Sequence, residues 1–262
     1  MLSTAGGFIE VAEVNPPLLP DMTHSHLEGK WQRILVTDNP FGQVRVSPFA
    51  YAARITHDAP SVRPTVVVST RDRNILAIES EVRGALGNGV DSFLVVVGDT
   101  LPEVDHWANH YEIVEHLLAL QERMPAFEVG MTTRFRSWQF RRRVELGAQF
   151  FVAGPVLDPD TVEASMRRLA IEEGDPPVFV GVVPPFSPSW ISRLESHGAV
   201  QASLALKEKI ASLPNGERRE EAWRLAAETT ERCRQAGAAG VVLMTLKFST
   251  LVGEAATAWG DH

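Results

Sequence analysis

The chain of 262 residues has one cysteine, Cys233, which excludes an internal disulfide. This cysteine lies in a helical pattern, and we interpret it as a packing residue. There is neither a run of about 18 apolar residues nor a signal-peptide pattern, so we expect a cytoplasmic protein without a membrane partner. Basic residues are outnumbered by acidic ones, 25 to 33, and the net charge of −8 argues against a general affinity for nucleic acid.

Two glycine-rich phosphate-binding patterns, GxGxxG and GxxxxGK[ST], are also missing, so phosphate binding by such loops is not implied. His106 and His110 have the i, i+4 spacing that can place two metal ligands on one helix face, but no third ligand accompanies them. We therefore expect no metal site.

What is present is a normal globular composition, with 44% hydrophobic and 22% charged residues. Residues 64–100 form the clearest unit in the chain. The β-branched run 65–69 predicts a strand buried on both faces, and 93–97 predicts a second one. Between them Ile75, Ile78 and Val82 mark one face of a helix that ends near Gly87. Two apolar strands joined by an amphipathic helix predict a parallel βαβ unit.

The same alternation continues along the chain, and it predicts one domain over residues 1–262 with the fold of a closed (β/α)8 (TIM) barrel, which commonly has about 250 residues. An open, doubly wound sheet is the alternative. The predicted strands are 8–14, 33–37, 65–69, 93–97, 126–131, 149–153, 178–183 and 240–246. The predicted helices are 24–31, 47–55, 75–86, 107–123, 136–146, 158–169, 189–196, 203–211, 217–236 and 249–259.

In such a barrel the residues just after each strand form the active face. Two carboxylates, Glu13 and Asp99, lie on or directly after apolar strands, where an unpaired charge is costly to bury. A half-buried carboxyl suits a general acid, and Glu13 has the more apolar setting, whereas Asp99 follows a glycine and could stabilise a developing cation. The alternative is that each carboxylate caps a helix or pairs with Arg71 or Lys247. Lys247 also leaves open a lyase or aldolase that uses its amine.

Several motifs together resemble the methylenetetrahydrofolate reductase family. They span nearly the whole chain and occur in the family's order and spacing: Glu13 to Pro17, Thr37, Thr70 to Asn74, Gly84-Ala85, Gly89, Gly98 to Thr100, Arg143-Val144, Leu146 to Ala148, Gly181 to Pro184 and Thr245-Leu246.

The resemblance implies a (β/α)8 barrel that reduces 5,10-methylenetetrahydrofolate to 5-methyltetrahydrofolate, or catalyses the reverse, with NAD(P)H and FAD as cofactors. Glu13 would be the general acid, and Asp99 would contact the folate and stabilise its iminium cation. Further substrate contacts would come from Gly154 and Phe186. The residues implied to bind cofactor are Thr37, Thr70, Arg71, Asp72, Gly98, Arg134 and Arg143.

The chain departs from the family's pattern mainly at flavin and pterin contacts. Val67 stands where the family usually has a histidine, and residues 132–136 replace a Tyr-x-x-x-His-Pro loop. The family's strand-six glutamine falls near Gly154. Arginines in 134–143 could bind a cofactor diphosphate instead, or form an ordinary solvated helix face. Alternatively, flavin binding is weak or absent, and the protein is a folate-binding homo-oligomer or the partner subunit of a flavoprotein or methyltransferase.

Overall fold

The alternation of strands and helices closes on itself in the computed structural model, which describes residues 1–4, 6–20, 22, 24, 27, 31–99, 108–196 and 200–245. Parallel strands pair in chain order and β8 pairs with β1, which confirms the predicted barrel and excludes the open sheet. The strands are β1 (Ile9–Val14), β2 (Arg33–Val36), β3 (Arg63–Ser69), β4 (Ser92–Val96), β5 (Glu128–Thr133), β6 (Phe150–Val156), β7 (Val178–Val182) and β8 (Gly240–Leu243).

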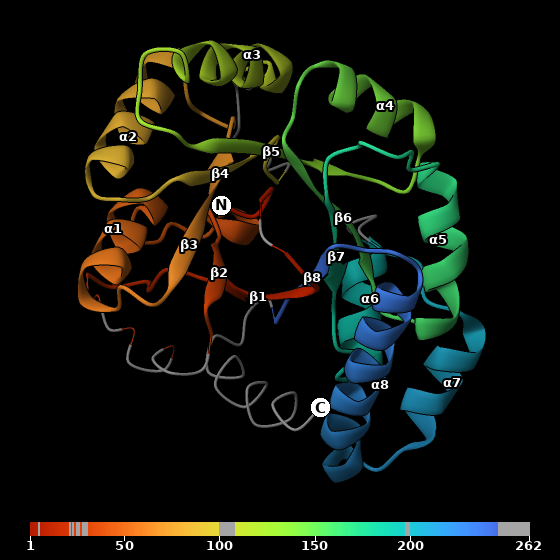
Figure 1. The fold of residues 1–262 in the computed structure, drawn as a ribbon. Helices are drawn as coiled ribbons and strands as arrows, with labels where there is room; N and C mark the ends of the chain where they lie inside the picture. The colour runs from red at the N-terminus through yellow and green to blue at the C-terminus, as the bar shows by residue number, and fades with distance from the viewer. Residues whose placement is uncertain are drawn as a thin grey trace.

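Helices surround this barrel, as the view along its axis in Figure 1 shows. The predicted helices that lie within the described residues begin and end within a few residues of their predicted bounds, as expected for helix ends, and the short helix at 40–42 was not predicted. The predicted helix at 249–259 and most of the one at 24–31 lie outside the described residues. The helices are η2 (Pro40–Gly42), α1 (Pro48–Asp58), α2 (Ile75–Gly87), α3 (His110–Leu120), α4 (Ser137–Glu145), η3 (Pro159–Thr161), α5 (Val162–Leu169), α6 (Pro188–Ser196), α7 (Leu204–Ser212) and α8 (Asn215–Gln235).

The strands are mainly apolar because both of their faces are buried. Leu35, Val67 and Leu94 belong to the cluster inside the barrel, whereas their chain neighbours Ile34 and Val66 pack in the layer between strands and helices. Successive side chains of a strand point to opposite faces, so each strand supplies both layers. This arrangement explains why continuous hydrophobic runs, rather than alternating ones, marked the strands in the sequence.

The N-terminal end of the barrel is filled by the first residues of the chain, and Figure 1 shows the N-terminus near the barrel axis. Leu2 is 2% exposed and packs with the interior cluster. The buried carboxylate of Glu128 accepts hydrogen bonds from the Leu2 N–H, from the Ser3 N–H at 2.7 Å and from Ser92 Oγ at 2.6 Å. These contacts satisfy a charge that would otherwise be costly inside a core.

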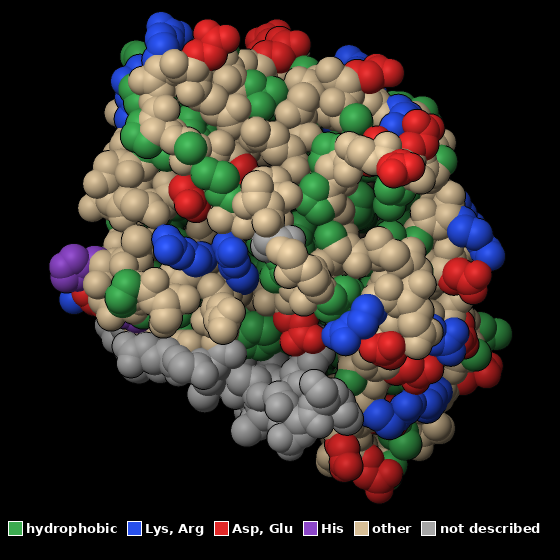
Figure 2. All heavy atoms as spheres, in the orientation of Figure 1, with side chains coloured by type: hydrophobic (Ala, Val, Ile, Leu, Met, Phe, Trp, Pro, Cys, Tyr) green, Lys and Arg blue, Asp and Glu red, His purple; other side chains and the backbone are tan. Residues whose placement is uncertain are grey.

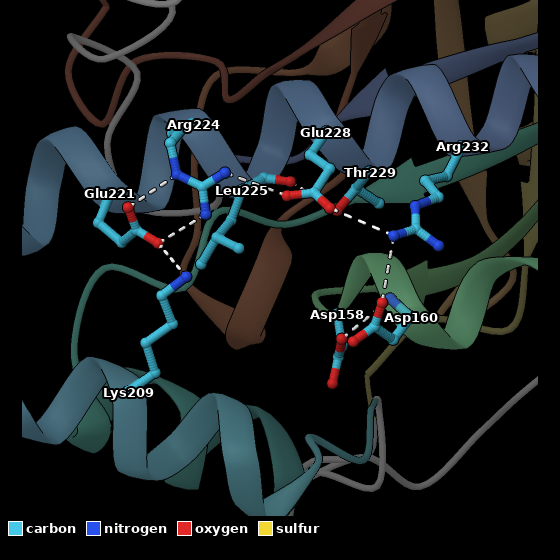
Figure 3. Close-up of polar contacts among 9 residues, drawn as sticks. All are labelled: Asp158, Asp160, Lys209, Glu221, Arg224, Leu225, Glu228, Thr229 and Arg232. Atoms are coloured by element: carbon cyan, nitrogen blue, oxygen red, sulfur yellow. Dashed lines mark hydrogen bonds and ion pairs between the residues drawn. The ribbon is translucent and has the colours of Figure 1, made fainter.

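Helix α8 is fixed to its neighbours by ion pairs along one face, which Figure 3 shows. Arg224 contacts Glu221 at 2.8 Å and Glu228 at 3.1 Å. Lys209 of α7 reaches Glu221 at 2.6 Å, and Arg232 reaches Asp160 of η3 at 3.3 Å. The charged residues of this face therefore serve the packing of α7, α8 and η3.

Outside the barrel, acidic and basic side chains are interspersed on the face that Figure 2 shows. Cys233 is fully buried, and burial raises the pKa of its thiol to about 12, in agreement with a packing role. Within the described ranges, no helix has the length and apolar character needed to cross a membrane. In the same ranges no group of three or more His, Cys, Asp or Glu side chains is placed to hold a metal ion.

Candidate functional site at the C-terminal ends of the strands

Both predicted carboxylates lie at the same end of the barrel. Glu13 is the penultimate residue of β1, is 8% exposed, and pairs in register with Leu35 of β2. Its side chain shares the inward side of β1 with Val11, because alternate residues of a strand face the same way. Asp99 follows the last residue of β4, Val96, by three positions. Parallel strands end at one rim, so the two carboxylates occupy the C-terminal face of the barrel.

Asp99 is exposed but its side chain is anchored. Its Oδ2 atom accepts a hydrogen bond of 2.6 Å from the N–H of Phe41, in the turn η2 that follows β2. Its backbone carbonyl accepts a second one, at 3.0 Å, from the guanidinium of Arg71. The carboxylate is therefore tied to the β2 loop and to the β3 loop while it stays open to solvent.

Arg71, predicted to bind cofactor, joins loops of the protein to one another. Its side chain is buried, and its second terminal nitrogen donates to the Asn39 carbonyl at 3.2 Å. Its backbone N–H donates to Ser69 Oγ at 3.3 Å. The two terminal nitrogens of Arg71 thus donate to two main-chain oxygens, one after β2 and one after β4.

The remaining predicted residues near β2, β3 and β4 differ in exposure. Thr37 is buried and its hydroxyl donates to Asn15 Oδ1 at 2.6 Å. Thr70 is fully buried, and its carbonyl accepts from the Ala108 N–H at 3.0 Å. Asp72 is exposed, with a φ of 54°. Gly98 has a φ of 91°, and a Cβ atom placed on it would lie 2.3 Å from Ser69 Oγ. This glycine is therefore needed by the close approach of the β3 and β4 ends.

A buried ion pair that the sequence-based prediction did not include stands beside these loops. Asp38 accepts from the Ser69 N–H at 3.0 Å and pairs with Arg73 at 2.6 Å. Arg73 also lies 3.5 Å from Glu81 of α2, whose pKa is raised by burial. Asp38 lies two residues after the end of β2 and Arg73 four residues after the end of β3, so the position of polar residues after strands was the available signal.

Arg143 lies between helices. It is 6% exposed, donates to the Thr132 carbonyl, and lies 3.4 Å from His110 Nε2. Burial lowers the pKa of Arg143, and burial together with Arg143 and Arg142 lowers that of His110 to about 4. His110 is therefore neutral at pH 7. Arg134, by contrast, is exposed, and its backbone N–H donates to Gln139 at 3.0 Å.

The two predicted substrate-contact residues on the far side of the rim are placed differently. Gly154 has a φ of 105° and lies in β6, where an added Cβ would meet Phe135 at 3.4 Å and the Gly181 carbonyl at 3.5 Å. Phe186 follows β7 and packs edge-on against Trp223 with ring centroids 5.2 Å apart. Lys247, the candidate amine nucleophile, lies outside the described residues.

A flavin diphosphate needs cations or open backbone N–H groups. Of the residues predicted to bind cofactor, Thr37 and Thr70 are buried, and Gly98 is half-buried with Ser69 and Arg71 packed where a Cβ would stand. The guanidinium groups of Arg71 and Arg143 donate to protein carbonyls. Asp72 and Arg134 are exposed. In the described part of the chain these residues do not by themselves form a cradle for the flavin diphosphate.

Away from the rim, a groove of about 710 Å³ separates α5 from α8 and is lined by Met166, Ile171 and Gly237 among others. These helices end there and lead into β7 and β8, so the groove lies toward the opposite end of the barrel.

Residues 18–260 match the family model described as methylenetetrahydrofolate reductase. The chain belongs to this family. The matched range includes Asp99 and Arg71 but begins after Glu13. The proposed role of Glu13 as general acid therefore depends on its position in β1. A comparison with curated protein sequences found no match to this chain.

A solved structure is similar over almost the full length of the chain. It is an uncharacterised protein from Clostridium thermocellum that binds two copies of 5-methyl-5,6,7,8-tetrahydrofolic acid. The TM-score is 0.62 at 12% identity, and the match covers 97% of this chain and 94% of the other. At this identity the likeness shows that the fold is shared.

Proposed function

We propose that this member of the methylenetetrahydrofolate reductase family binds a reduced folate and interconverts 5,10-methylenetetrahydrofolate and 5-methyltetrahydrofolate. The observation that carries the proposal is the placement of two carboxylates at one end of a closed barrel, one buried and one exposed but anchored. Such a pair can divide acid chemistry and charge stabilisation between two environments. Family membership and the folate bound by the similar structure support the choice of substrate.

In the direction of reduction, Glu13 gives its proton to the folate nitrogen that leaves the one-carbon unit. The carbon–nitrogen bond of the imidazolidine ring breaks, and the remaining nitrogen shares its electron pair with the carbon to form an iminium cation. Asp99 stabilises this cation by its negative charge. Addition of a hydride to the iminium carbon then gives the methyl group, and NAD(P)H is the proposed hydride source. In the reverse reaction the methyl group gives its hydride to NAD(P)+, the same cation forms, and ring closure returns the proton to Glu13.

Two measurements on the purified full-length protein test the proposal. Isothermal titration with 5-methyltetrahydrofolate should give saturable binding, and the protein should oxidise this folate in the presence of an artificial electron acceptor. Tetrahydrofolate without the methyl group serves as the control substrate for the oxidation. Binding without turnover under any acceptor would refute the enzymatic part, and absence of binding would refute the proposal as a whole.

A second candidate function follows from the enclosed cofactor residues. The chain could be a folate-binding subunit with weak or no flavin binding that acts as a homo-oligomer or beside a flavoprotein or methyltransferase. The internal hydrogen bonds of Thr37 and Arg71 favour this reading. The visible spectrum separates the two candidates. A yellow chromophore in near-stoichiometric amount, or turnover with NADH alone, supports the enzyme, whereas a colourless protein that binds folate, does not take up FAD and shows no turnover supports the subunit.

A further inference from the structure

Asn39 connects two arginines in the turn after β2. It adopts a left-handed conformation with a φ of 47°. Its side-chain oxygen accepts a hydrogen bond of 2.8 Å from the backbone N–H of Arg45, and its main-chain carbonyl accepts one of 3.2 Å from the Arg71 guanidinium. An asparagine tolerates this conformation better than most side chains. One residue therefore offers an acceptor to each arginine.

Arg45 leads from Asn39 to the strand that carries Glu13. Its guanidinium donates to the Pro16 carbonyl at 2.7 Å, three residues after Glu13, and to the Gln43 side chain at 2.9 Å. Burial lowers the pKa of Arg45, yet an arginine keeps its charge at neutral pH. A charged donor on a main-chain carbonyl makes a stronger hydrogen bond than a neutral one.

Arg71 leads from Asn39 in the other direction, to Asp99. It donates to the Asp99 carbonyl at 3.0 Å, and the Asp99 side chain is bonded to the Phe41 N–H, two residues after Asn39. Hydrogen bonds therefore run without a break from the residues after Glu13, through Arg45, Asn39 and Arg71, to Asp99. The connection spans the loops after β1, β2 and β4 and the start of the loop after β3.

We propose that Arg45, Asn39 and Arg71 form a positioning bridge that sets the place of Asp99 relative to Glu13. This inference rests on the proposed function, since the bridge matters for turnover only where the two carboxylates act together. Arg71 in this role is a positioning residue that acts through Asp99, rather than a ligand of the cofactor diphosphate. A small displacement of a charge from the developing cation weakens catalysis strongly, by up to about 100-fold for 1 Å.

The geometry of the arginine side chain is what the bridge requires. The planar guanidinium directs two terminal nitrogens to two separate carbonyl oxygens, whereas a lysine ammonium on a flexible stem is a single charged point. Arg71→Lys therefore keeps the charge but releases either Asn39 or Asp99. We expect the turnover rate of Arg71→Lys at saturating folate to fall by about 10- to 100-fold while the Kd of 5-methyltetrahydrofolate changes less than about threefold.

The matched control is Arg218→Lys. Arg218 also donates to two main-chain carbonyls, those of Ile210 at 3.0 Å and Ala211 at 3.2 Å, but between α7 and α8. This variant should turn over like the wild type. An equal loss of turnover in both variants would mean that the effect is general destabilisation. Weaker folate binding with unchanged turnover in Arg71→Lys would mean that Arg71 contacts the ligand. Either result overturns the positioning bridge.

Hydrogen exchange gives a readout that does not need activity. The Phe41 N–H is protected by Asp99, so peptides covering residues 39–43 should exchange at least about tenfold faster in Arg71→Lys and unchanged in Arg218→Lys. If the wild-type protein shows no folate turnover, the proposed function fails, and exchange alone decides the bridge. Unchanged exchange at residues 39–43 overturns it, even where the wild type is active.

Discussion

Gly98→Ala tests why a glycine follows β4. The residue has a φ of 91°, and an added Cβ would lie 2.3 Å from Ser69 Oγ and 3.2 Å from Arg71 Cβ. An L-residue in a left-handed conformation costs about 1–2 kcal/mol. Rotating the Ser69 hydroxyl away costs about 1 kcal/mol, and losing its hydrogen bond from the Arg71 N–H costs about 1 kcal/mol more. We therefore expect the free energy of unfolding to fall by about 3 kcal/mol.

Urea denaturation followed by circular dichroism measures this loss, and a second variant divides it into its parts. In a Ser69→Ala background the hydroxyl is absent, so Gly98→Ala should cost only the backbone part, about 1–2 kcal/mol. If Gly98 served only to contact a cofactor, replacing it with alanine would change the stability of the free protein little. A loss below about 0.5 kcal/mol for Gly98→Ala, or the same loss in both backgrounds, would refute the reasoning.

Two further predictions concern the fold. Hydrogen bonds from Arg224 and then Lys209 lower the pKa of Glu221 from 4.5 to about 2 despite its partial burial, so its contribution to stability is complete above about pH 4.5 and is lost as the pH falls toward 2. Because Arg224 and Lys209 are about half exposed, Glu221→Gln should lower the free energy of unfolding by about 1 kcal/mol at pH 7. It should also make this free energy less dependent on pH below about pH 4.5, whereas the control Glu220→Gln should change neither quantity. The same acid dependence in both variants would contradict this prediction. In the barrel interior, a Cβ on Gly130 would lie 2.4 Å from the Phe150 ring, so Gly130→Ala should cost about 3 kcal/mol in thermal or urea unfolding. Adding Phe150→Leu should recover part of that loss, and no recovery would show that the contact is not the cause.

The barrel was predictable because its strands are buried on both faces. Continuous apolar runs such as 65–69 and 178–183 are typical of strands in a parallel sheet that is covered on both faces. The alternation of such strands with helices predicts a barrel, and residues that follow the strands, such as Asp99, then lie at its C-terminal rim. The sequence pattern alone therefore predicted that both carboxylates lie at one end of the barrel.

The contacts of the rim residues could not be predicted in the same way. Arg45 reaches Pro16, 29 positions away, and Arg71 reaches Asn39, 32 positions away, so no local pattern identifies either partner. Arg143 was predicted to bind cofactor, with a solvated helix face as the alternative, yet it is buried where α4 packs on β5 and α3. The partner of each rim side chain depends on which loops the closed barrel brings together, and no local sequence pattern shows this.

The most direct test of the account is the turnover of Glu13→Gln with 5-methyltetrahydrofolate and an artificial acceptor. Glu10→Gln is the control, since Glu10 lies on the same strand but faces outward near Arg234. Loss of a general acid typically costs 100-fold or more, so we predict a fall of at least about 100-fold for Glu13→Gln, with folate binding retained, and little change for Glu10→Gln. A Glu13→Gln protein that turns over at the wild-type rate would contradict the assignment of Glu13 as the acid.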